Sequence, residues 1–257
     1  MTKTNKNKLR VFSSVELLNR SAAELLVQIA DEAVKARGRF LLCLSGGNTP
    51  KSLYALLSVN PYPDLIPWEN TFVFWGDERC VPADDERNNA HEAKALLLQK
   101  TNLPSSHIFP VPVNLPPAGA ANKYEQTLRD FFGQESPCFD LILLGLGENG
   151  HTASLFPGTM VLREKSRWVQ QVFVKEQQMN RITMTAPLIN QAHHILFLVT
   201  GAAKAGILKA VLTEPFQPER YPAQLIRPEQ GEVYWFADKH AAAGLPLNDS
   251  IFFDRKA

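Results

Sequence analysis

The sequence predicts a single α/β domain of three layers, in which a mostly parallel, Rossmann-like sheet lies between two layers of helices. Short apolar runs without polar alternation are typical of parallel strands that are covered on both faces. Segments with helical spacing of apolar residues separate these runs, and no shift in composition divides the 257 residues into blocks. We therefore expect one domain over residues 11–257, preceded by a flexible tail over residues 1–10.

The first helix is predicted over Val15–Arg37, because apolar residues recur there at helical spacing and Gly38, a favoured helix-stop residue, follows. The apolar runs then predict five strands, at 40–44, 71–75, 139–144, 195–200 and 233–236. Helical segments are expected from Pro50 onward, at 90–99 and at 202–212. This alternation of strand and helix leads to the three-layer prediction.

Composition excludes several classes of protein. The 27 Lys and Arg residues nearly balance 26 Asp and Glu, which argues against a nucleic-acid binder. No apolar run approaches the length of about 18 residues that a membrane span needs, and the polar N-terminus does not resemble a secretory signal. The cysteines, Cys43, Cys80 and Cys138, are scattered, which favours a reducing cytoplasm and no structural zinc. Nothing indicates an obligate protein partner.

The first candidate site is the loop Ser45-Gly46-Gly47-Asn48-Thr49-Pro50, which follows a predicted strand. The glycines allow a ligand to approach the backbone, and Thr49 as N-cap with Pro50 at the first helical position would direct free N–H groups toward an anion. The loop lacks the ending of a Walker motif, so a small phosphoester is the expected ligand. The alternative is a tight turn that binds nothing.

The second candidate site follows the strand at 71–75. Arg79 could hold an oxyanion there while Asp77 or Glu78 orients it. The alternative is an ordinary solvated loop.

The third candidate site contains His151, directly after Gly145-Leu146-Gly147-Glu148-Asn149-Gly150. This string formally matches a dinucleotide-binding fingerprint, but Pro157-Gly158 follows too soon for the usual covering helix. A neutral histidine in such a loop can act as a general base, with a pKa near the ordinary value of about 6.5. The alternative is a histidine with a purely structural role.

The fourth candidate site combines two cations. Lys204 falls in the first turn after a predicted strand, and Arg181 could supply a bidentate contact to a phosphate. Taken singly, each could equally be a surface cation. The remaining histidines form no spaced cluster with acidic residues, so we expect no metal and no cofactor.

Together these segments resemble the 6-phosphogluconolactonase family, which hydrolyses a phosphorylated sugar lactone in the oxidative pentose phosphate pathway. The resemblance is carried by four strings in order: Ser45-Gly46-Gly47-x-Thr49-Pro50, Asp77-Glu78-Arg79-x-Val81-Pro82, Gly147-x-x-Gly150-His151-Thr152-Ala153-Ser154-Leu155-Phe156-Pro157, and Arg181-x-Thr183 with Thr200-Gly201-x-x-Lys204-Ala205.

The resemblance implies a sugar-phosphate-binding α/β domain that needs no cofactor. It places the phosphate on Arg181, Lys204 and the loop of Ser45, Gly46, Gly47 and Thr49. It also implies that His151 activates water and that Arg79 lies near the lactone. Many relatives carry aspartate where this chain has Asn149, so the role of that carboxylate is either lost or moved to Glu148.

Two alternatives stay open. The chain is also similar to glucosamine-6-phosphate deaminases, but their catalytic loop carries two acids where this chain has Asn149 and Phe156. Proton shuttling for ring opening and amine loss would then lack carriers. A catalytically silent sugar-phosphate sensor would keep Ser45, Arg181 and Lys204, yet it could dispense with His151.

Overall fold

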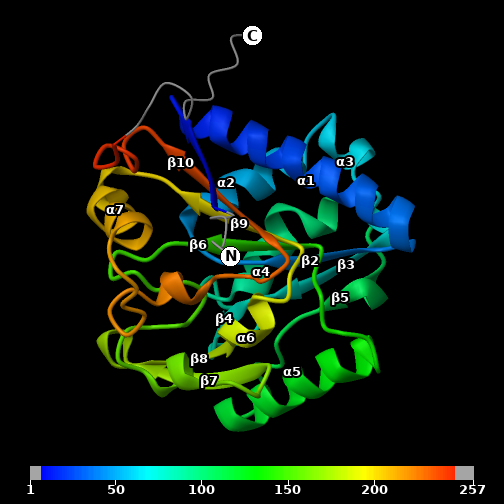
Figure 1. The fold of residues 1–257 in the computed structure, drawn as a ribbon. Coiled ribbons are helices and arrows are strands. Elements are labelled where there is room, and N and C mark those ends of the chain that lie inside the picture. Colours follow the sequence, from blue (N-terminus) through cyan, green and yellow to red (C-terminus); the bar gives the residue numbers. More distant parts are fainter. Residues whose placement is uncertain (1–6, 247–257) are drawn as a thin grey trace.

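The computed structural model describes residues 7–246 and has a seven-stranded sheet at its centre (Figure 1). The strand order is β1-β10-β9-β6-β2-β3-β5, and every neighbouring pair is parallel. The strands are β1 (Asn7–Phe12), β2 (Phe40–Leu44), β3 (Thr71–Trp75), β5 (Ile108–Phe109), β6 (Leu141–Gly145), β9 (His194–Val199) and β10 (Glu232–Asp238).

Helices cover this sheet, and Figure 1 shows α1 to α3 on one side and α5 on the other. The helices are α1 (Val15–Arg37), α2 (Asn48–Leu57), α3 (Tyr62–Leu65), α4 (Asn89–Leu96), α5 (Pro117–Phe132), α6 (Ala186–Ile189) and α7 (Ala205–Thr213). Helix α1 begins and ends as its sequence predicts: the Ser14 side chain accepts from the Leu17 N–H, and Gly38 adopts a left-handed conformation. The predicted three-layer α/β fold is confirmed.

A second, antiparallel sheet lies at one end of the molecule and was not predicted. It has the order β4-β8-β7, with β4 (Asp77–Arg79), β8 (Met179–Met184) and β7 (Val169–Val174). The predicted loop after β3 therefore contains a strand. Its partner β8 lies about a hundred positions along the chain, which is why the pattern at 76–89 alone did not indicate pairing.

The predicted N-terminal tail is wrong for residues 7–10, which belong to β1. Their backbone pairs in parallel with β10, and Val11 and Phe12 at the end of β1 are buried. Residues 7–10 therefore belong to the folded domain. Residues 1–6 of the predicted tail and residues 247–257 of the predicted domain lie outside the described residues.

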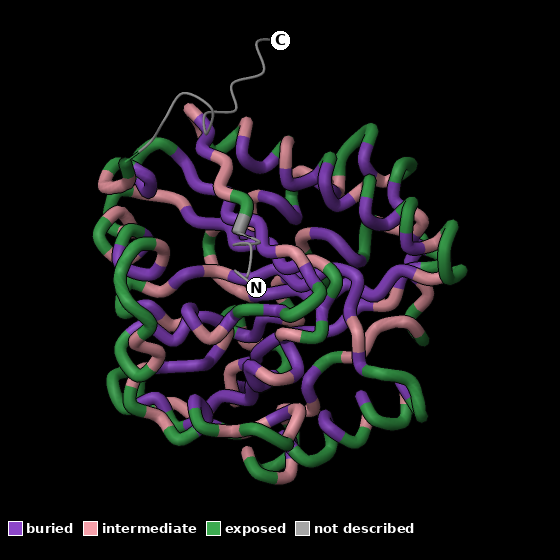
Figure 2. Tube along the Cα trace, viewed as in Figure 1, coloured by how far each residue is buried: buried purple, intermediate pink, exposed green. Residues whose placement is uncertain are grey.

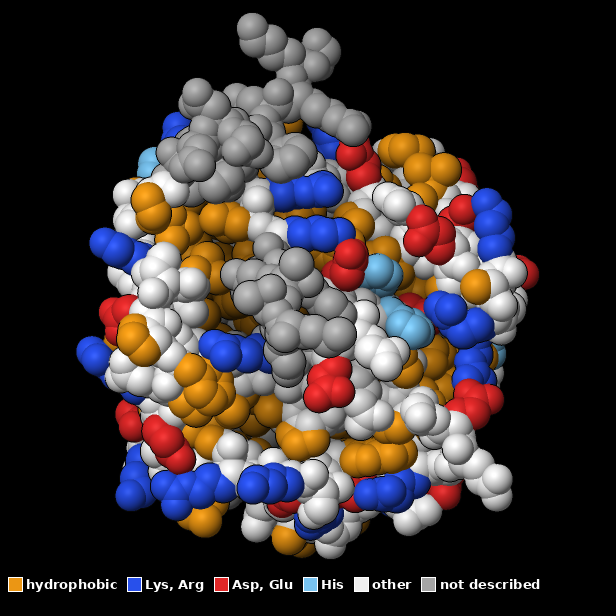
Figure 3. Space-filling view, in the orientation of Figure 1, with side chains coloured by type: hydrophobic (Ala, Val, Ile, Leu, Met, Phe, Trp, Pro, Cys, Tyr) orange, Lys and Arg blue, Asp and Glu red, His pale blue; other side chains and the backbone are white. Residues whose placement is uncertain are grey.

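The core sits along the central strands, where Figure 2 shows continuous buried chain. Every residue of β2 is buried, and Phe74 of β3 packs against the rings of Phe109, Phe131 and Phe139. Outside the core, Figure 3 shows both signs of charge interspersed on the face that it displays. Within residues 7–246, none of the helices has the length and hydrophobicity that a membrane span requires.

Candidate active site

A cavity of about 500 Å³ opens at the carboxyl ends of β2, β6 and β9, beside the small sheet. This is where ligands bind in open parallel sheets. Ten of the predicted site residues line it: Ser45, Gly46, Gly47, Thr49, Asp77, Arg79, Glu148, His151, Arg181 and Lys204. Glu78 and Asn149 are not among the lining residues.

The loop between β2 and α2 forms one wall. Its start is fixed by Tyr54, whose hydroxyl donates to the Ser45 carbonyl at 2.7 Å and accepts from the Ser45 N–H at 3.1 Å. The predicted cap is wrong in detail, because α2 begins at Asn48 and Gly47, with a φ of 111°, precedes it. A left-handed φ of this kind favours glycine, and it lets the chain turn into the helix two residues earlier than predicted.

Thr49 therefore lies inside the first turn of α2, and its hydroxyl does not cap the helix. Its Oγ1 lies 2.8 Å from Oγ1 of Thr200, at the end of β9. This hydrogen bond joins the loop to the strand that precedes Lys204. The first turn of α2, Asn48–Pro50, lines the cavity. The N–H groups of Asn48 and Thr49 have no partner within their own helix, as an anion site requires.

Two arginines stand opposite each other in the small sheet, because Arg79 of β4 pairs in register with Arg181 of β8. The Arg181 guanidinium is buried and lies 3.5 Å from the Asp77 carboxylate, which also accepts from the Ser154 hydroxyl at 2.6 Å. Arg79 donates to the Arg87 carbonyl at 2.7 Å. Since one carboxylate cannot neutralise two guanidiniums, this side of the cavity attracts an anion.

Lys204 adds a third cation to the cavity. Its ammonium lies 4.0 Å from the exposed carboxylate of Glu148, and burial lowers its pKa. Buried polar atoms of the lining have no hydrogen-bond partner among the described residues: Ser45 Oγ, Arg79 Nε, Asn89 Oδ1 and Arg181 Nε. Buried polar atoms are normally satisfied, so their concentration around one cavity favours a polar ligand there.

His151 is oriented by Asn149. The Asn149 Oδ1 accepts from the His151 backbone N–H at 3.2 Å and lies 2.6 Å from the His151 Nδ1. Because the backbone N–H can only donate, the atom that faces it must be the amide oxygen, and Nδ1 must then carry the proton. The ring is left with Nε2 as an acceptor, so the neutral histidine has the tautomer that a general base needs.

The surroundings of the ring keep it neutral. It stacks on Phe156 with 3.9 Å between centroids, and a Cβ at Gly147 would fall 2.0 Å from Nδ1, so only glycine leaves room for the ring. Burial is the main cause that lowers the pKa of His151 to about 4; nearby Asp77 opposes this, whereas Arg181, Lys204 and Arg79 add to it. This corrects the expectation of a pKa near 6.5.

Glu78 has a different position from the one predicted. Its carboxylate is fully buried at the start of α4, where Oε1 accepts from the backbone N–H groups of Arg79 and Asn89, and Oε2 from that of Ala90. Burial raises its pKa to about 7, against the effect of these hydrogen bonds. Asp77 and Glu78 were both proposed to orient Arg79. Within residues 7–246 neither carboxylate forms an ion pair with the Arg79 guanidinium, and Asp77 pairs with Arg181 instead.

The sequence did not single out Gln177 and Thr200 as site residues. Gln177 lies in the tight turn between β7 and β8, and its side-chain oxygen accepts from the Arg181 guanidinium. Asn89 belongs to the predicted loop after β3 and carried no predicted role, although it lines the cavity. Thr200 belongs to a string that carries the family resemblance, where it had no assigned role. Nothing local marks Gln177, which reaches the site through the pairing of β7 with β8.

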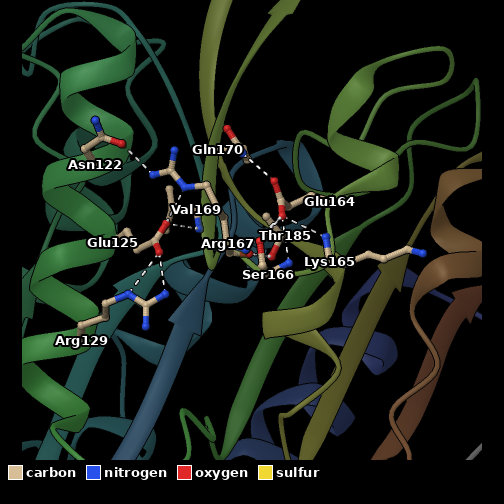
Figure 4. Close-up of polar contacts among 10 residues, drawn as sticks. All are labelled: Asn122, Glu125, Arg129, Glu164, Lys165, Ser166, Arg167, Val169, Gln170 and Thr185. Carbon is tan, nitrogen blue, oxygen red and sulfur yellow. Dashed lines mark hydrogen bonds and ion pairs between the residues drawn. The ribbon is translucent and has the colours of Figure 1, made fainter.

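A polar network outside the cavity fixes the small sheet to α5 (Figure 4). The Glu125 carboxylate of α5 accepts from Arg129, from Arg167 and from the Val169 N–H at the start of β7. Glu164 accepts from three consecutive backbone N–H groups, those of residues 165–167. These bonds define the course of the chain into β7, and β7 in turn pairs with the strand that carries Arg181.

The chain matches a known protein family over most of its length. The family model described as glucosamine-6-phosphate isomerases/6-phosphogluconolactonase matches residues 13–235. The chain belongs to this family. Within the family, it is 43% identical over 218 residues to a 6-phosphogluconolactonase of Synechocystis sp., covering 83% of this chain and 88% of that protein.

Solved structures agree with the fold. The 6-phosphogluconolactonase from Trypanosoma cruzi matches with a TM-score of 0.83 at 30% identity, covering 94% of this chain and 97% of that one. A monomeric glucosamine-6-phosphate deaminase matches with a TM-score of 0.79 at 23% identity, covering 92% and 99%; at that identity the likeness shows the fold alone. The description of the family model names both glucosamine-6-phosphate isomerases and 6-phosphogluconolactonases.

Proposed function

We propose that the protein hydrolyses 6-phospho-D-glucono-1,5-lactone to 6-phospho-D-gluconate, the lactonase step of the oxidative pentose phosphate pathway. The observation that carries this proposal is a neutral, oriented histidine in a cavity with three cations. A deaminase is less well supported, because Asn149 and Phe156 stand at the two acid positions and Phe156 packs on the His151 ring. The relatives from Synechocystis and Trypanosoma cruzi, both named as lactonases, also support this choice.

In this proposal the phosphate binds between the first turn of α2, Arg181 and Lys204. The lactone ring then extends toward His151 and Arg79. Anchoring a remote charged group in this way positions the reacting carbonyl and reduces the entropic cost of the attack by water.

The chemical step uses His151 as the base. Its Nε2 takes a proton from a water molecule while the water oxygen forms a bond to the lactone carbonyl carbon. Arg79 or backbone N–H groups of the cavity stabilise the oxyanion. When the tetrahedral intermediate collapses, the bond from this carbon to the ring oxygen breaks, and the imidazolium returns a proton to that oxygen. The carboxylic acid formed in this step loses its proton to solvent, so the product is an open-chain carboxylate that keeps its phosphate.

The direct test is a lactonase assay on freshly made 6-phosphogluconolactone with the spontaneous rate subtracted. We expect rapid turnover of this substrate and slow turnover of unphosphorylated gluconolactone. Equal rates for the two lactones would contradict the anion site. Turnover of glucosamine 6-phosphate in place of the lactone would favour the deaminase.

We expect hydrolysis to survive exhaustive EDTA treatment, because His151 provides the base without a metal-bound water. Across the described part of the chain, no three His, Cys, Asp or Glu side chains gather so as to hold a metal ion. Independence from metal remains a prediction, as does a cytoplasmic location. Activity that disappears with EDTA and returns with added zinc or magnesium would contradict this mechanism.

The pH profile should report the environment of His151. The base must be neutral, so kcat/KM should stay high on the acid side and fall only as the pH drops through about 4. In Asn149→Asp, a carboxylate beside Nδ1 would stabilise the imidazolium and move this limb upward by about 1–3 pH units. Glu148→Gln is the control, since it changes a charge in the same loop without touching the ring. An unmoved limb in Asn149→Asp would show that His151 does not titrate in the profile.

A further inference from the structure

Asn89 is a buried residue of the cavity wall to which the mechanism gives no part. It is the first residue of α4 and is 2% exposed. Its Nδ2 donates to the Asp77 carbonyl at 2.9 Å, and since that carbonyl can only accept, the amide oxygen must point the other way. On that side lies Gly46.

The contact with Gly46 is close enough to exclude any side chain there. A Cβ at Gly46 would fall 1.9 Å from Asn89 Oδ1 and 2.4 Å from its Cγ. Gly46 has no positive φ, in contrast to Gly47, so its backbone does not demand glycine. Gly46 is therefore required for space, and the Asn89 amide fills the place that its side chain would take.

Asn89 itself is held from β4. The Glu78 carboxylate accepts from the N–H groups of Asn89 at 2.7 Å and of Ala90 at 2.9 Å, the first two of α4. A carboxylate at a helix N-terminus is electrostatically favourable and satisfies N–H groups that lack partners within the helix. A continuous set of contacts thus runs from β4 through Asn89 to the loop that begins α2.

We propose that Asn89 is a positioning residue for the anion-binding loop Ser45–Thr49. By packing on Gly46 it fixes the backbone N–H groups that receive the phosphate, and Glu78 fixes Asn89. The inference rests on the proposed function in that it assumes a phosphate at this loop. It assigns Asn89 no contact with the reacting atoms.

The main test is Asn89→Ala, with affinity for 6-phosphogluconate measured by calorimetry. Without the packing on Gly46, the loop should lose the equivalent of one hydrogen bond from its backbone N–H groups to the phosphate, which weakens binding about tenfold. KM for the phosphorylated lactone should rise by a similar factor, while kcat at saturation changes by less than about twofold. A fall in kcat with KM unchanged would overturn the proposal.

Asn88→Ala is the matched control. Asn88 is equally buried and adjacent, but its side chain caps α4 through the His91 N–H and does not line the cavity. Loss of this cap should lower the melting temperature by about 2–4 °C and leave the affinity for 6-phosphogluconate unchanged. If both variants weakened binding equally, Asn89 would matter only for the stability of α4, and the proposal would be wrong.

A second pair of variants approaches the same contact from the loop. Gly46→Ala should weaken binding more than Asn89→Ala, because the new methyl group collides with an amide that Glu78 and Asp77 hold in place. In the double variant Gly46→Ala/Asn89→Ala this collision is absent, so binding should be tighter than in Gly46→Ala alone. Additive losses in the double variant would contradict the inferred contact. If Asn89→Ala does not fold, Asn89→Ser takes its place in both experiments.

Binding measurements separate this inference from the proposed function, since they need no turnover. Suppose that the wild-type protein binds 6-phosphogluconate and inorganic phosphate but does not hydrolyse the lactone, and that Asn89→Ala binds more weakly than Asn88→Ala. This result would disprove only the proposed activity. An active wild-type enzyme whose Asn89→Ala variant binds normally would disprove only the positioning role.

Discussion

His151→Asn is expected to lower kcat by about 10²- to 10⁴-fold, because it removes the proposed general base. Asparagine is smaller but polar, so the loop should keep its fold and the cations of the cavity should keep their affinity for phosphate. The acid limb of the pH profile should vanish as well. The measurements are kcat, the melting temperature and the affinity for 6-phosphogluconate, made on one preparation.

His107→Asn is a matched control for the loss of a stacked ring. His107 stacks on Phe72 with 3.9 Å between centroids, as His151 stacks on Phe156, but it does not line the cavity. Both variants should lose similar stability, and only His151→Asn should lose turnover. A His151→Asn protein that is fully active per folded molecule would leave the ring with a structural role alone.

Arg181→Ala is expected to reduce kcat/KM for the phosphorylated lactone by roughly 10- to 100-fold, from the loss of a charge-assisted contact of about 1.5–3 kcal/mol. The loss should appear mainly in KM, and turnover of unphosphorylated gluconolactone should change little. Stability should also fall, since Asp77 would remain buried without its cation.

The stability effect has its own control in Arg37→Ala. Arg37 pairs with Asp140, another buried carboxylate, and neither residue lines the cavity. This variant should unfold at a lower temperature and keep its KM. If Arg181→Ala weakened the two lactones equally, Arg181 would support the small sheet and would not bind phosphate.

Local sequence was sufficient for the elements that bury a continuous face. The runs at β2 and β3 and the spacing in α1 follow from which residues must leave water, a property that each short segment carries by itself. The ends of strands in a parallel sheet meet at one edge, so the sequence alone indicates that the loops of Ser45 and His151 lie close together. The family resemblance rested on those same loops.

Only the tertiary structure shows which distant segments of the chain pair as strands. Arg79 faces Arg181 because β4 pairs with β8, and β1 pairs with β10 although residues 7–10 are largely polar. Backbone hydrogen bonds hold these strand pairs together. Almost every residue type can form such bonds, so a sequence pattern does not reveal which strands pair.

The pKa of His151 was likewise set by packing. The ordinary pKa of histidine is a property of the residue, but the value of about 4 for His151 comes chiefly from burial within the folded site, with added repulsion from three cations drawn from separate strands and loops. Sequence alone left open whether Glu148 replaces the missing carboxylate. In the folded loop the Glu148 carboxylate lies near the Lys204 ammonium and away from the His151 ring. The Asn149 amide contacts the ring instead, and its oxygen accepts from both the ring and the backbone N–H of His151.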